Sequence, residues 1–380
     1  MRYTTLSGIA ALATVLANGV GAVPAVAGGS GSGIPVACDT AALINAINTA
    51  PAGSTLVLAR HCTYHLNSAY AGDDGLPPID KQLTIEGRDS TIVRDGVAAG
   101  TFRIFHVTST GDLRLDDVTI RGGDALGDGG GILVDPSGML KLNEVILDNN
   151  TTAQEGGGVD VEGGATAYIT RSEFTFNNAA EGGGGLQSDG TVTTDGVVFS
   201  RNFAVDGGAI DHEGGDSIYR NTILKNNASS NDGGGIDLDG GTAQFINSKI
   251  LNNTTAGATG GGIWNAASLT LIKTEVAGNV AGGANGQGGG IYEDTGTLVL
   301  QYSSVDRNSA NGSGTSQAGG IFNTGGAVTL DRSEVNNNAS TVAPGGVWTD
   351  TQFMVTGSEI RNNIPTNCDG SPVIVTGCTG

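Results

Sequence analysis

A glycine run that ends in a branched or aliphatic residue recurs nine times along this chain of 380 residues. The shortest spacing between successive copies runs from Leu186 to Ile210, and the longest runs from Ile291 to Ile321. Self-similarity at such a period is typical of a solenoid, in which one repeat buries its apolar face only when neighbours stack on it. The residues that close the nine runs are Ile132, Val159, Leu186, Ile210, Ile236, Ile263, Ile291, Ile321 and Val347.

The second half of each copy ends in an aliphatic residue or Phe, two spacers and an asparagine. Both Asn and Gly tolerate the left-handed backbone that a tight corner demands. We therefore interpret the recurring asparagines as structural corner residues rather than as ligands. They are Asn149, Asn177, Asn202, Asn226, Asn253, Asn279, Asn308, Asn338 and Asn363.

Composition narrows the class of protein and its partners. Gly supplies 65 residues, but 38% hydrophobic residues at fixed repeat positions argue against a disordered chain. The formal charge is -20, from 38 acidic and 18 basic residues. Nucleic acid and anionic membrane surfaces are therefore excluded as partners of the chain as a whole. Cationic groups, metal ions and neutral polymers remain, and a monomer is expected.

The N-terminal segment, residues 1–27, predicts an export signal. Arg2 is followed by an apolar stretch that ends in the small-x-small sequence Ala25-Val26-Ala27. The alternative, an uncleaved membrane anchor, needs ~20 continuous apolar residues. We expect a secreted protein without membrane insertion, in which residues 28–37 form a flexible lead-in.

Four cysteines lie outside the nine copies, as two local pairs. In an oxidising compartment this pattern favours two disulfides, Cys38 with Cys62 and Cys368 with Cys378, each closing one end of the solenoid. The alternative is a metal site built from all four cysteines. That site requires the two ends to meet, which a rod forbids.

A single domain is expected over residues 38–380. Residues 39–49 carry apolar residues at helical spacing behind an Asp or Thr N-cap, and we assign them as an N-terminal capping helix. Strands are expected at residues 55–58, 83–86, 91–93, 102–107 and 113–120. The capping helix and first coils then occupy residues 38–122, the nine repeat coils 123–363, and a C-terminal cap 364–380.

The Gly-Gly-Gly-Ile and Ile/Phe-x-x-Asn elements resemble the repeats of polymorphic outer membrane proteins and of secreted proteins of the pectate-lyase-like superfamily. Leu83-Thr84-Ile85-Glu86-Gly87, with Thr91-Ile92-Val93 after it, resembles the first coils of that superfamily behind its capping helix. Over residues 38–363 the resemblance implies an all-β fold, a right-handed single-stranded parallel β-helix. It implies no single activity, because such repeats occur in lyases, hydrolases and adhesins.

Alternation along the strand after each glycine run sends the first and third following residues outward. This count predicts a field of carboxylates through the middle copies, densest at Asp160, Glu162, Asp211, Glu213, Asp237 and Asp239. Three interpretations are open: a solvated surface, a cation site that suits calcium, and a catalytic or substrate-binding face. Asp211 and Asp237 on adjacent coils lie ~4.8 Å apart, which is close enough for one carboxyl to hold its proton beside an ionised neighbour.

The same count predicts an aromatic stripe in the last four copies, formed by Trp264, Tyr292, Phe322 and Trp348. Large aromatic side chains on a solvent face favour stacking against sugar rings. The alternative is that the C-terminal segment from Pro365 covers them. His212 falls at an inward position between two acids, and its alternative role is that of an outward proton donor.

Two classes of function remain. The first is a secreted protein that binds polysaccharide or a cell-surface partner through this acidic and aromatic face, with Asp160 and the four aromatic residues as contacts. The second is a polysaccharide lyase or glycoside hydrolase that uses Asp211, Glu213, Asp237 and Asp239, with calcium as the expected ion if one binds. The first is preferred because the Gly-His-Gly and Arg-Ile-Lys segments of polygalacturonase-type hydrolases are missing. The basic residues of the repeats, among them Arg171 and Lys249, also fall on a different face from the acids.

Overall fold

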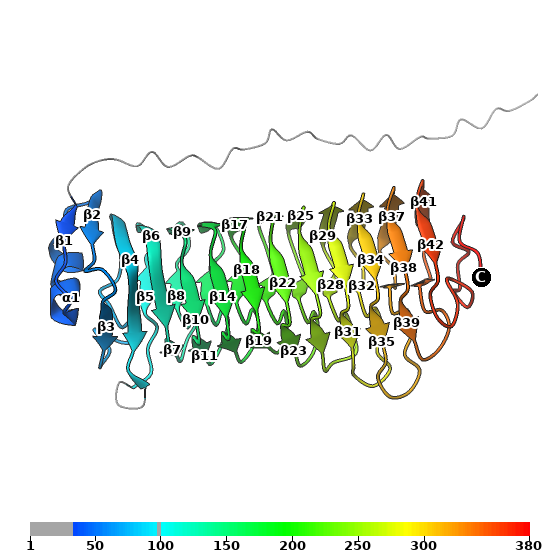
Figure 1. Ribbon diagram of the computed structural model, residues 1–380, viewed down its shortest axis with the longest axis horizontal. Helices are drawn as coiled ribbons and strands as arrows, with labels where there is room; N and C mark the ends of the chain where they lie inside the picture. Colours follow the sequence, from blue (N-terminus) through cyan, green and yellow to red (C-terminus); the bar gives the residue numbers. More distant parts are fainter. Residues whose placement is uncertain (1–32, 97–99) are drawn as a thin grey trace, which may run out of the picture. The chain divides into compact units, whose positions relative to one another are not determined.

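The computed structural model describes residues 33–96 and 100–380. The expected signal peptide lies outside the described residues. From β4 onward the chain winds in coils that stack along one axis, as Figure 1 shows, and every ladder between named strands is parallel. The nine repeats are therefore coils of a parallel solenoid, as their period predicts.

The strands form three sheets that run the length of the stack. The largest has 23 strands: β1 (Ile34–Pro35), β2 (Ser54–Val57), β3 (Thr63–Leu66), β4 (Gln82–Arg94), β6 (Asp112–Arg121), β9 (Met139–Asn143), β10 (Ile146–Asp148), β13 (Thr166–Thr170), β14 (Glu173–Thr175), β17 (Thr191–Asp195), β18 (Val198–Ser200), β21 (Asp216–Arg220), β22 (Ile223–Lys225), β25 (Thr242–Ile246), β26 (Lys249–Leu251), β29 (Ser268–Ile272), β30 (Glu275–Ala277), β33 (Thr297–Gln301), β34 (Ser304–Asp306), β37 (Ala327–Asp331), β38 (Glu334–Asn336), β41 (Phe353–Thr356) and β42 (Glu359–Arg361).

The nine-stranded sheet holds the two-residue strands: β7 (Asp124–Ala125), β11 (Thr151–Thr152), β15 (Asn178–Ala179), β19 (Phe203–Ala204), β23 (Ala228–Ser229), β27 (Thr254–Thr255), β31 (Val280–Ala281), β35 (Ser309–Ala310) and β39 (Ala339–Ser340). The ten-stranded sheet holds the strands that follow the glycine runs: β5 (Phe105–Val107), β8 (Ile132–Val134), β12 (Val159–Val161), β16 (Leu186–Ser188), β20 (Ile210–His212), β24 (Ile236–Leu238), β28 (Ile263–Asn265), β32 (Ile291–Glu293), β36 (Ile321–Asn323) and β40 (Val347–Thr349).

Each full coil has four strands. In the coil of β12 to β15, the left-handed residue Arg171 (φ 46) lies at the corner before β14, and Phe176 (φ 54) lies at the corner after it. Early in the chain, the two strands expected at residues 83–86 and 91–93 are one strand, β4. A register shift between Glu86 and Ser90 marks the bend inside it.

The recurring asparagines form a buried ladder along the stack. Each ladder side chain accepts from the backbone N–H and the amide of its predecessor, as Asn253 Oδ1 does from Asn227 at 3.0 Å and 2.9 Å. Its own amide also donates to a backbone carbonyl of the preceding coil, from Asn253 Nδ2 to Leu224 O at 3.0 Å. The members are Asn150, Asn177, Asn202, Asn227, Asn253, Asn279, Asn308, Asn338 and Asn363.

The ladder corrects two sequence assignments. In two coils the buried asparagine is Asn150 or Asn227, one residue after the expected Asn149 or Asn226. The left-handed corner is occupied by the residue before the ladder member, as at Asn149 (φ 54) and Asn226 (φ 56). The ladder asparagines are therefore needed for their amide hydrogen bonds and not for backbone freedom.

The N-terminal end is closed by α1 (Thr40–Thr49), whose N-cap Asp39 accepts from the backbone N–H of Ala42 at 2.9 Å. Its buried residues Leu43 and Ile47 belong to the same apolar core as the coils. The predicted disulfide Cys38–Cys62 is present. Ile34 and Pro35, at the end of the segment expected as a lead-in, form β1 and pair with β2.

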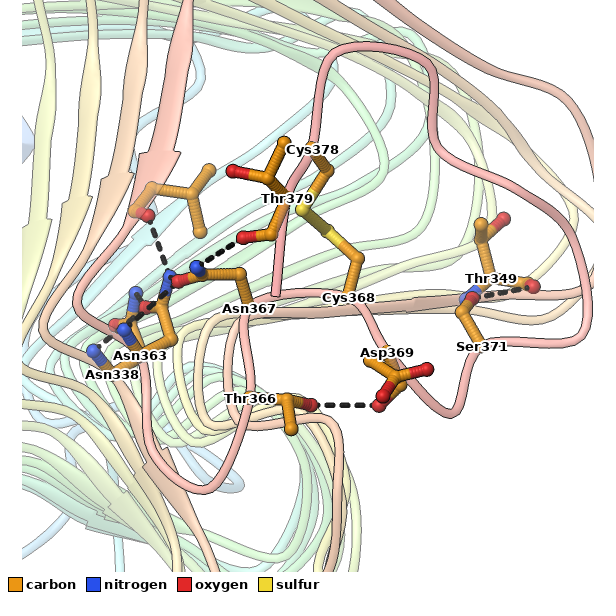
Figure 2. The surroundings of a disulfide bond; sticks show 11 residues. Asn338, Thr349, Asn363, Thr366, Asn367, Cys368, Asp369, Ser371, Cys378 and Thr379 are labelled. Atoms are coloured by element: carbon orange, nitrogen blue, oxygen red, sulfur yellow. Dashed lines mark hydrogen bonds between the residues drawn. A yellow bond between two sulfur atoms is a disulfide. The ribbon is translucent and has the colours of Figure 1, made fainter.

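The C-terminal segment closes the other end around the predicted disulfide Cys368–Cys378 (Figure 2). Asn367 is a last rung of the asparagine ladder, and its Oδ1 accepts from Asn363 at 3.0 Å. Asn367 Nδ2 donates to Thr379 O, and Ser371 Oγ accepts from the N–H of Thr349 in β40. With both pairs closed, the described chain has no free cysteine for a four-cysteine metal site.

Candidate functional site

The middle residue of each strand in the ten-stranded sheet points away from the core, because the residues on both sides of it face inward. We call these ten residues the central column: His106, Leu133, Asp160, Gln187, Asp211, Asp237, Trp264, Tyr292, Phe322 and Trp348. The register of neighbouring strands places each of them beside the next. The shared register that the sequence count assumes is therefore present.

Two further columns flank the central column. The rim column lies two residues later in each coil and holds Asp135, Glu162, Asp189, Glu213, Asp239, Ala266, Asp294, Thr324 and Asp350. The loop column lies four residues before the closing hydrophobic residue and holds Asp128, Glu155, Gly182, Asp206, Asp232, Thr259, Gln287 and Gln317. Backbone bonds from one coil to the next align the loop column.

The acidic members of the central column are more buried than their outward direction predicts. Asp160 is 2% exposed, and Asp211 and Asp237 are each 3% exposed. Gly182 accounts for part of this burial, because a Cβ added there would lie 2.0 Å from Asp211 Oδ2. The missing side chain in the loop column thus leaves room for the Asp211 carboxyl. A solvated surface is not a correct description of these three residues, whereas Glu213 and Asp239 in the rim column are exposed.

The buried acids have no partners. Asp211 Oδ1 and Asp237 Oδ1 are buried atoms without a hydrogen bond, and Asp160 makes no salt bridge or side-chain hydrogen bond of its own among the described residues. Burial, reinforced by nearby carboxylates, holds the pKa of Asp160, Asp211 and Asp237 well above the ordinary value of an aspartate. Burial, together with the nearby carboxyl groups of Glu213 and Asp128, raises the pKa of Glu155 to about 7.

Twelve carboxyl groups gather along this half of the sheet. Burial and the charge of neighbouring acids raise the pKa of nine of them, and no basic side chain lowers the pKa of those nine. We call the full set the acidic half: Asp128, Glu155, Asp160, Glu162, Glu181, Asp189, Asp206, Asp211, Glu213, Asp232, Asp237 and Asp239. Sequence reasoning missed its loop-column members. The sequence does contain a signal for them, because an acidic residue stands four positions before each of Ile132, Val159, Ile210 and Ile236.

Basic residues of the repeats lie elsewhere. From Lys141 to Arg361 they occupy strands of the 23-stranded sheet or the corners beside it. Most are paired there with acids, as Arg171 is with Glu144 at 2.9 Å and Lys249 with Glu275 at 3.0 Å. The acidic half therefore keeps its charge uncompensated by the side chains of its own coils.

At the N-terminal end the central column begins with a histidine between two carboxyl groups. His106 lies between Asp74, at 3.0 Å from Nδ1, and Asp135, at 3.0 Å from Nε2. The hydrogen bond to Asp74 is the largest cause that raises the pKa of His106. Arg103 binds Asp74 at 2.7 Å and contacts Asp73. This network ends the acidic half on that side.

One group of acids fits a metal ion. Asp128, Asp160 and Glu162 each place a carboxylate oxygen within 4.8 Å of the other two. Carboxylate oxygens are the ligands that calcium prefers, and the buried Asp160 carboxyl has no other partner. Backbone bonds position Asp128, whose Oδ1 accepts from the N–H of Glu155 at 3.4 Å. These residues would hold the calcium ion that the sequence suggests.

The four aromatic residues form one stack. The ring centroids of Trp264 and Tyr292 are 6.5 Å apart, those of Tyr292 and Phe322 are 5.6 Å apart, and those of Phe322 and Trp348 are 4.2 Å apart. Neighbouring planes deviate by no more than 10°. The rings therefore turn their faces to one another and their edges outward. Phe322 is 2% exposed, and the other three are half-buried.

His212 is fully buried and faces the core, so its alternative role as an outward proton donor is wrong. Burial lowers the pKa of its imidazole to about 4. Glu293 occupies the same inward position on β32 and is also fully buried. Burial raises the pKa of Glu293 to about 8. Both groups are neutral at intermediate pH and belong to the interior.

Comparison with known proteins identifies the fold. Residues 103–281 match the family model described as right handed beta helix region. This match and the stacked parallel strands together show the fold, a right-handed parallel β-helix. No curated protein matches it. The A-module of the mannuronan C-5 epimerase AlgE6 from Azotobacter vinelandii is similar at 14% identity and a TM-score of 0.44, over 84% of this chain and 93% of that module. Among the residues that this β-helix structure describes, no helix has the length and apolar content to span a membrane.

Proposed function

We propose that this β-helix protein is secreted and binds an extracellular polysaccharide along the ten-stranded sheet. The acidic half and the aromatic stack carry the proposal, because they form one continuous line across neighbouring coils and the described acids of that line make no salt bridge. Coils stack at ~4.8 Å, a spacing comparable to the length of one sugar unit in an extended chain. Repeated polar groups along such a line suit a repetitive polymer. A cell-surface partner that displays the same polymer would use the same face.

Extracellular location is supported by two observations. Both cysteine pairs are closed as disulfides, which persist in oxidising compartments. The segment that ends at Ala27 has the pattern of an export signal. Mass spectrometry of the protein recovered from culture medium tests the location, and an N-terminus near Gly28 is the expected result.

Binding is tested with immobilised neutral, cationic and anionic polysaccharides, with and without calcium. The charge-reversal variants Glu213→Lys and Asp239→Lys alter exposed positions of the rim column. The matched controls Glu144→Lys and Glu359→Lys alter exposed positions of the 23-stranded sheet. We expect only the rim variants to lose retention on the bound polymer. Equal retention of all four variants would place binding elsewhere.

Glycoside hydrolysis is the second candidate, favoured by the half-buried Glu155, whose pKa is raised to about 7 by burial and by the charge of other acids, the exposed Glu213 among them. A protonated carboxyl next to an ionised one is the pair that such enzymes use. Asp211 and Asp237 have raised pKa values but are buried, so the exposed Glu213 and Asp239 are better placed for a substrate. A lyase that uses a basic side chain beside these acids is not favoured, because the repeats place their basic residues on another sheet. Reducing-end assays with Glu155→Gln separate the candidates, since only catalysis requires that proton.

A further inference from the structure

We propose that the acidic half recognises a polymer that carries ammonium groups, an amino-sugar polysaccharide, and that the indole of Trp264 closes the end of this site. The inference rests on the proposed function and names the class of polymer. It starts from the boundary between the acidic half and the aromatic stack. At that boundary Asp237 and Trp264 are neighbours in the register of β24 and β28.

Trp264 differs from the other three stacked residues in having one ring face without an aromatic neighbour on the acidic side. Tyr292 covers its other face, with a centroid distance of 6.5 Å. On the side of β24 its column neighbour is the short side chain of Asp237. Around this position lie Asp232 in the loop column and Asp239 in the rim column, and both raise the pKa of Asp237. An indole face beside carboxylates is a favourable environment for an organic cation.

Unpartnered buried groups extend this environment along the acidic half. Asp211 and Asp237 each keep a buried carboxyl oxygen without a donor, at 3% exposure of the residue. A neutral sugar brings hydroxyl groups, which leave the repulsion between these acids in place. An ammonium group brings a positive charge, which relieves the repulsion between these acids, and N–H donors for the exposed carboxylates of the rim column. Uronate polymers bring further negative charge and are disfavoured without a bridging cation.

Direct contact is expected at the exposed carboxylates of the rim column, Glu213 and Asp239, one on each of two successive coils. Buried acids behind them respond to the bound charge. A nearby cation lowers the pKa of a carboxyl that burial has raised, so binding releases protons from the acidic half. Proton release distinguishes this site from exposed carboxylates that are already ionised, since those have no protons to give up.

The test uses isothermal titration calorimetry at mildly acidic pH, where the amino group of glucosamine is charged. A soluble glucosamine oligomer is compared with its N-acetylated counterpart and with an oligogalacturonate. We expect the glucosamine oligomer alone to bind in the absence of calcium, with protons released to the buffer. The heat should therefore change with the ionisation enthalpy of the buffer, and raising the salt concentration should weaken binding.

Two matched variants localise the site. Trp264→Leu removes the indole at the acidic boundary, and Trp348→Leu removes the one at the far end of the stack. Loss of a cation–aromatic contact at Trp264 weakens binding by between about 2-fold and about 30-fold, and Trp348→Leu should weaken it less, because Trp348 lies at the end of the stack away from the acidic half. Circular dichroism checks that both variants fold. Glu213→Gln should also weaken binding, whereas Glu144→Gln on the other sheet should not.

The outcomes separate this inference from the proposed function. Equal affinity for the N-acetylated oligomer, or binding of the uronate alone with calcium, overturns recognition of ammonium but keeps a polysaccharide-binding face. Equal effects of Trp264→Leu and Trp348→Leu overturn the boundary site. If none of the three oligomers and none of the immobilised polysaccharides binds, both the recognition of ammonium and the proposed polysaccharide binding are refuted.

Discussion

At the scale of single residues, the asparagine ladder shows how one side-chain type satisfies several buried backbone groups. Each rung accepts two hydrogen bonds and donates two, so its removal leaves partners on both adjacent coils unpaired. An unpaired buried polar group costs about 1–3 kcal/mol. The ladder asparagines are therefore the residues at which a small substitution has the largest effect.

Asn253→Ala tests this expectation. The change removes the acceptor of the Asn227 N–H and side-chain amide, and the donor to Leu224 O. We expect a loss of about 3–5 kcal/mol in the free energy of unfolding, measured by urea denaturation. The control Asn252→Ala alters the exposed neighbour at φ 53 and should cost about 1 kcal/mol. Similar losses for both variants would mean that the corner, and not the ladder, determines stability.

The repeat pattern of the sequence predicts the coils and their register, but it does not predict which side chains are buried. The period and the closing hydrophobic residues predict the coils, the register and the alignment of Trp264 with Tyr292, because parallel stacking repeats one geometry in every coil. Burial of Asp160 and Asp211 could not be predicted in the same way. This burial depends on the backbone of the loop column, which precedes each strand in the sequence, and on the missing side chain at Gly182. The alternation of side chains along the strand gives no information about either feature.

At the scale of elements, the aromatic stack differs from a sugar-binding platform. Its inner ring faces pack against one another, so the stack contributes to stability, and a face without an aromatic neighbour remains at each end, with the one at Trp264 turned to the acidic half. Phe322→Ala removes the ring between Tyr292 and Trp348 and should cost about 3–5 kcal/mol, as other buried aromatic truncations do. Trp264→Ala, at the half-buried end, should cost less. Guanidinium denaturation of the two variants provides the comparison, and a negligible cost for Phe322→Ala would show that the stack is not packed.

The loop before β8, which holds Asp128, and strand β12 with the residue after it, which hold Asp160 and Glu162, together form the expected cation site. If calcium binds Asp128, Asp160 and Glu162, the melting temperature should rise with calcium concentration. Mass action gives about 2.7 kcal/mol at one hundred times the dissociation constant. Calorimetric scans of the wild type and of Asp160→Asn provide the test. A shift that survives the substitution would locate the ion elsewhere, and no shift would exclude calcium from this trio.

At the scale of the whole molecule, uncompensated carboxyls determine how stability depends on pH. Asp160, Asp211, Asp237, Glu155 and Glu293 have pKa values raised by folding. Between the ordinary pKa of each carboxyl and its raised pKa in the folded protein, the folded state binds more protons than the unfolded chain. Stability therefore falls as the pH rises through that interval. For Glu155 the window extends from its ordinary value to about 7, and for Glu293 to about 8. His212 acts oppositely between about 4 and 6.5.

Above pH 6.5, the groups that still titrate with a shifted pKa are the carboxyls whose pKa is raised and His106. The loss of a proton from any of them lowers the stability of the folded state. In buffer without divalent cations, the melting temperature should therefore fall by at least a few degrees between pH 6.5 and 8. Asp237→Asn keeps the shape of the protonated carboxyl without its charge and should reduce the fall. A melting temperature that is constant or rises over this range would show that a cation or solvent compensates the acidic half.

The ladder also determines how the chain tolerates changes of length. The loop from a ladder asparagine to the next closing hydrophobic residue is short between Asn202 and Ile210 and clearly longer between Asn308 and Ile321. Extra residues in that loop leave both endpoints in register. A single residue inserted into a strand would instead turn its side chains to the opposite face. Gene duplication that adds a whole coil supplies one more rung and one more member of every column, so the length of the outer face is set by repeat number and can evolve without redesign of the fold.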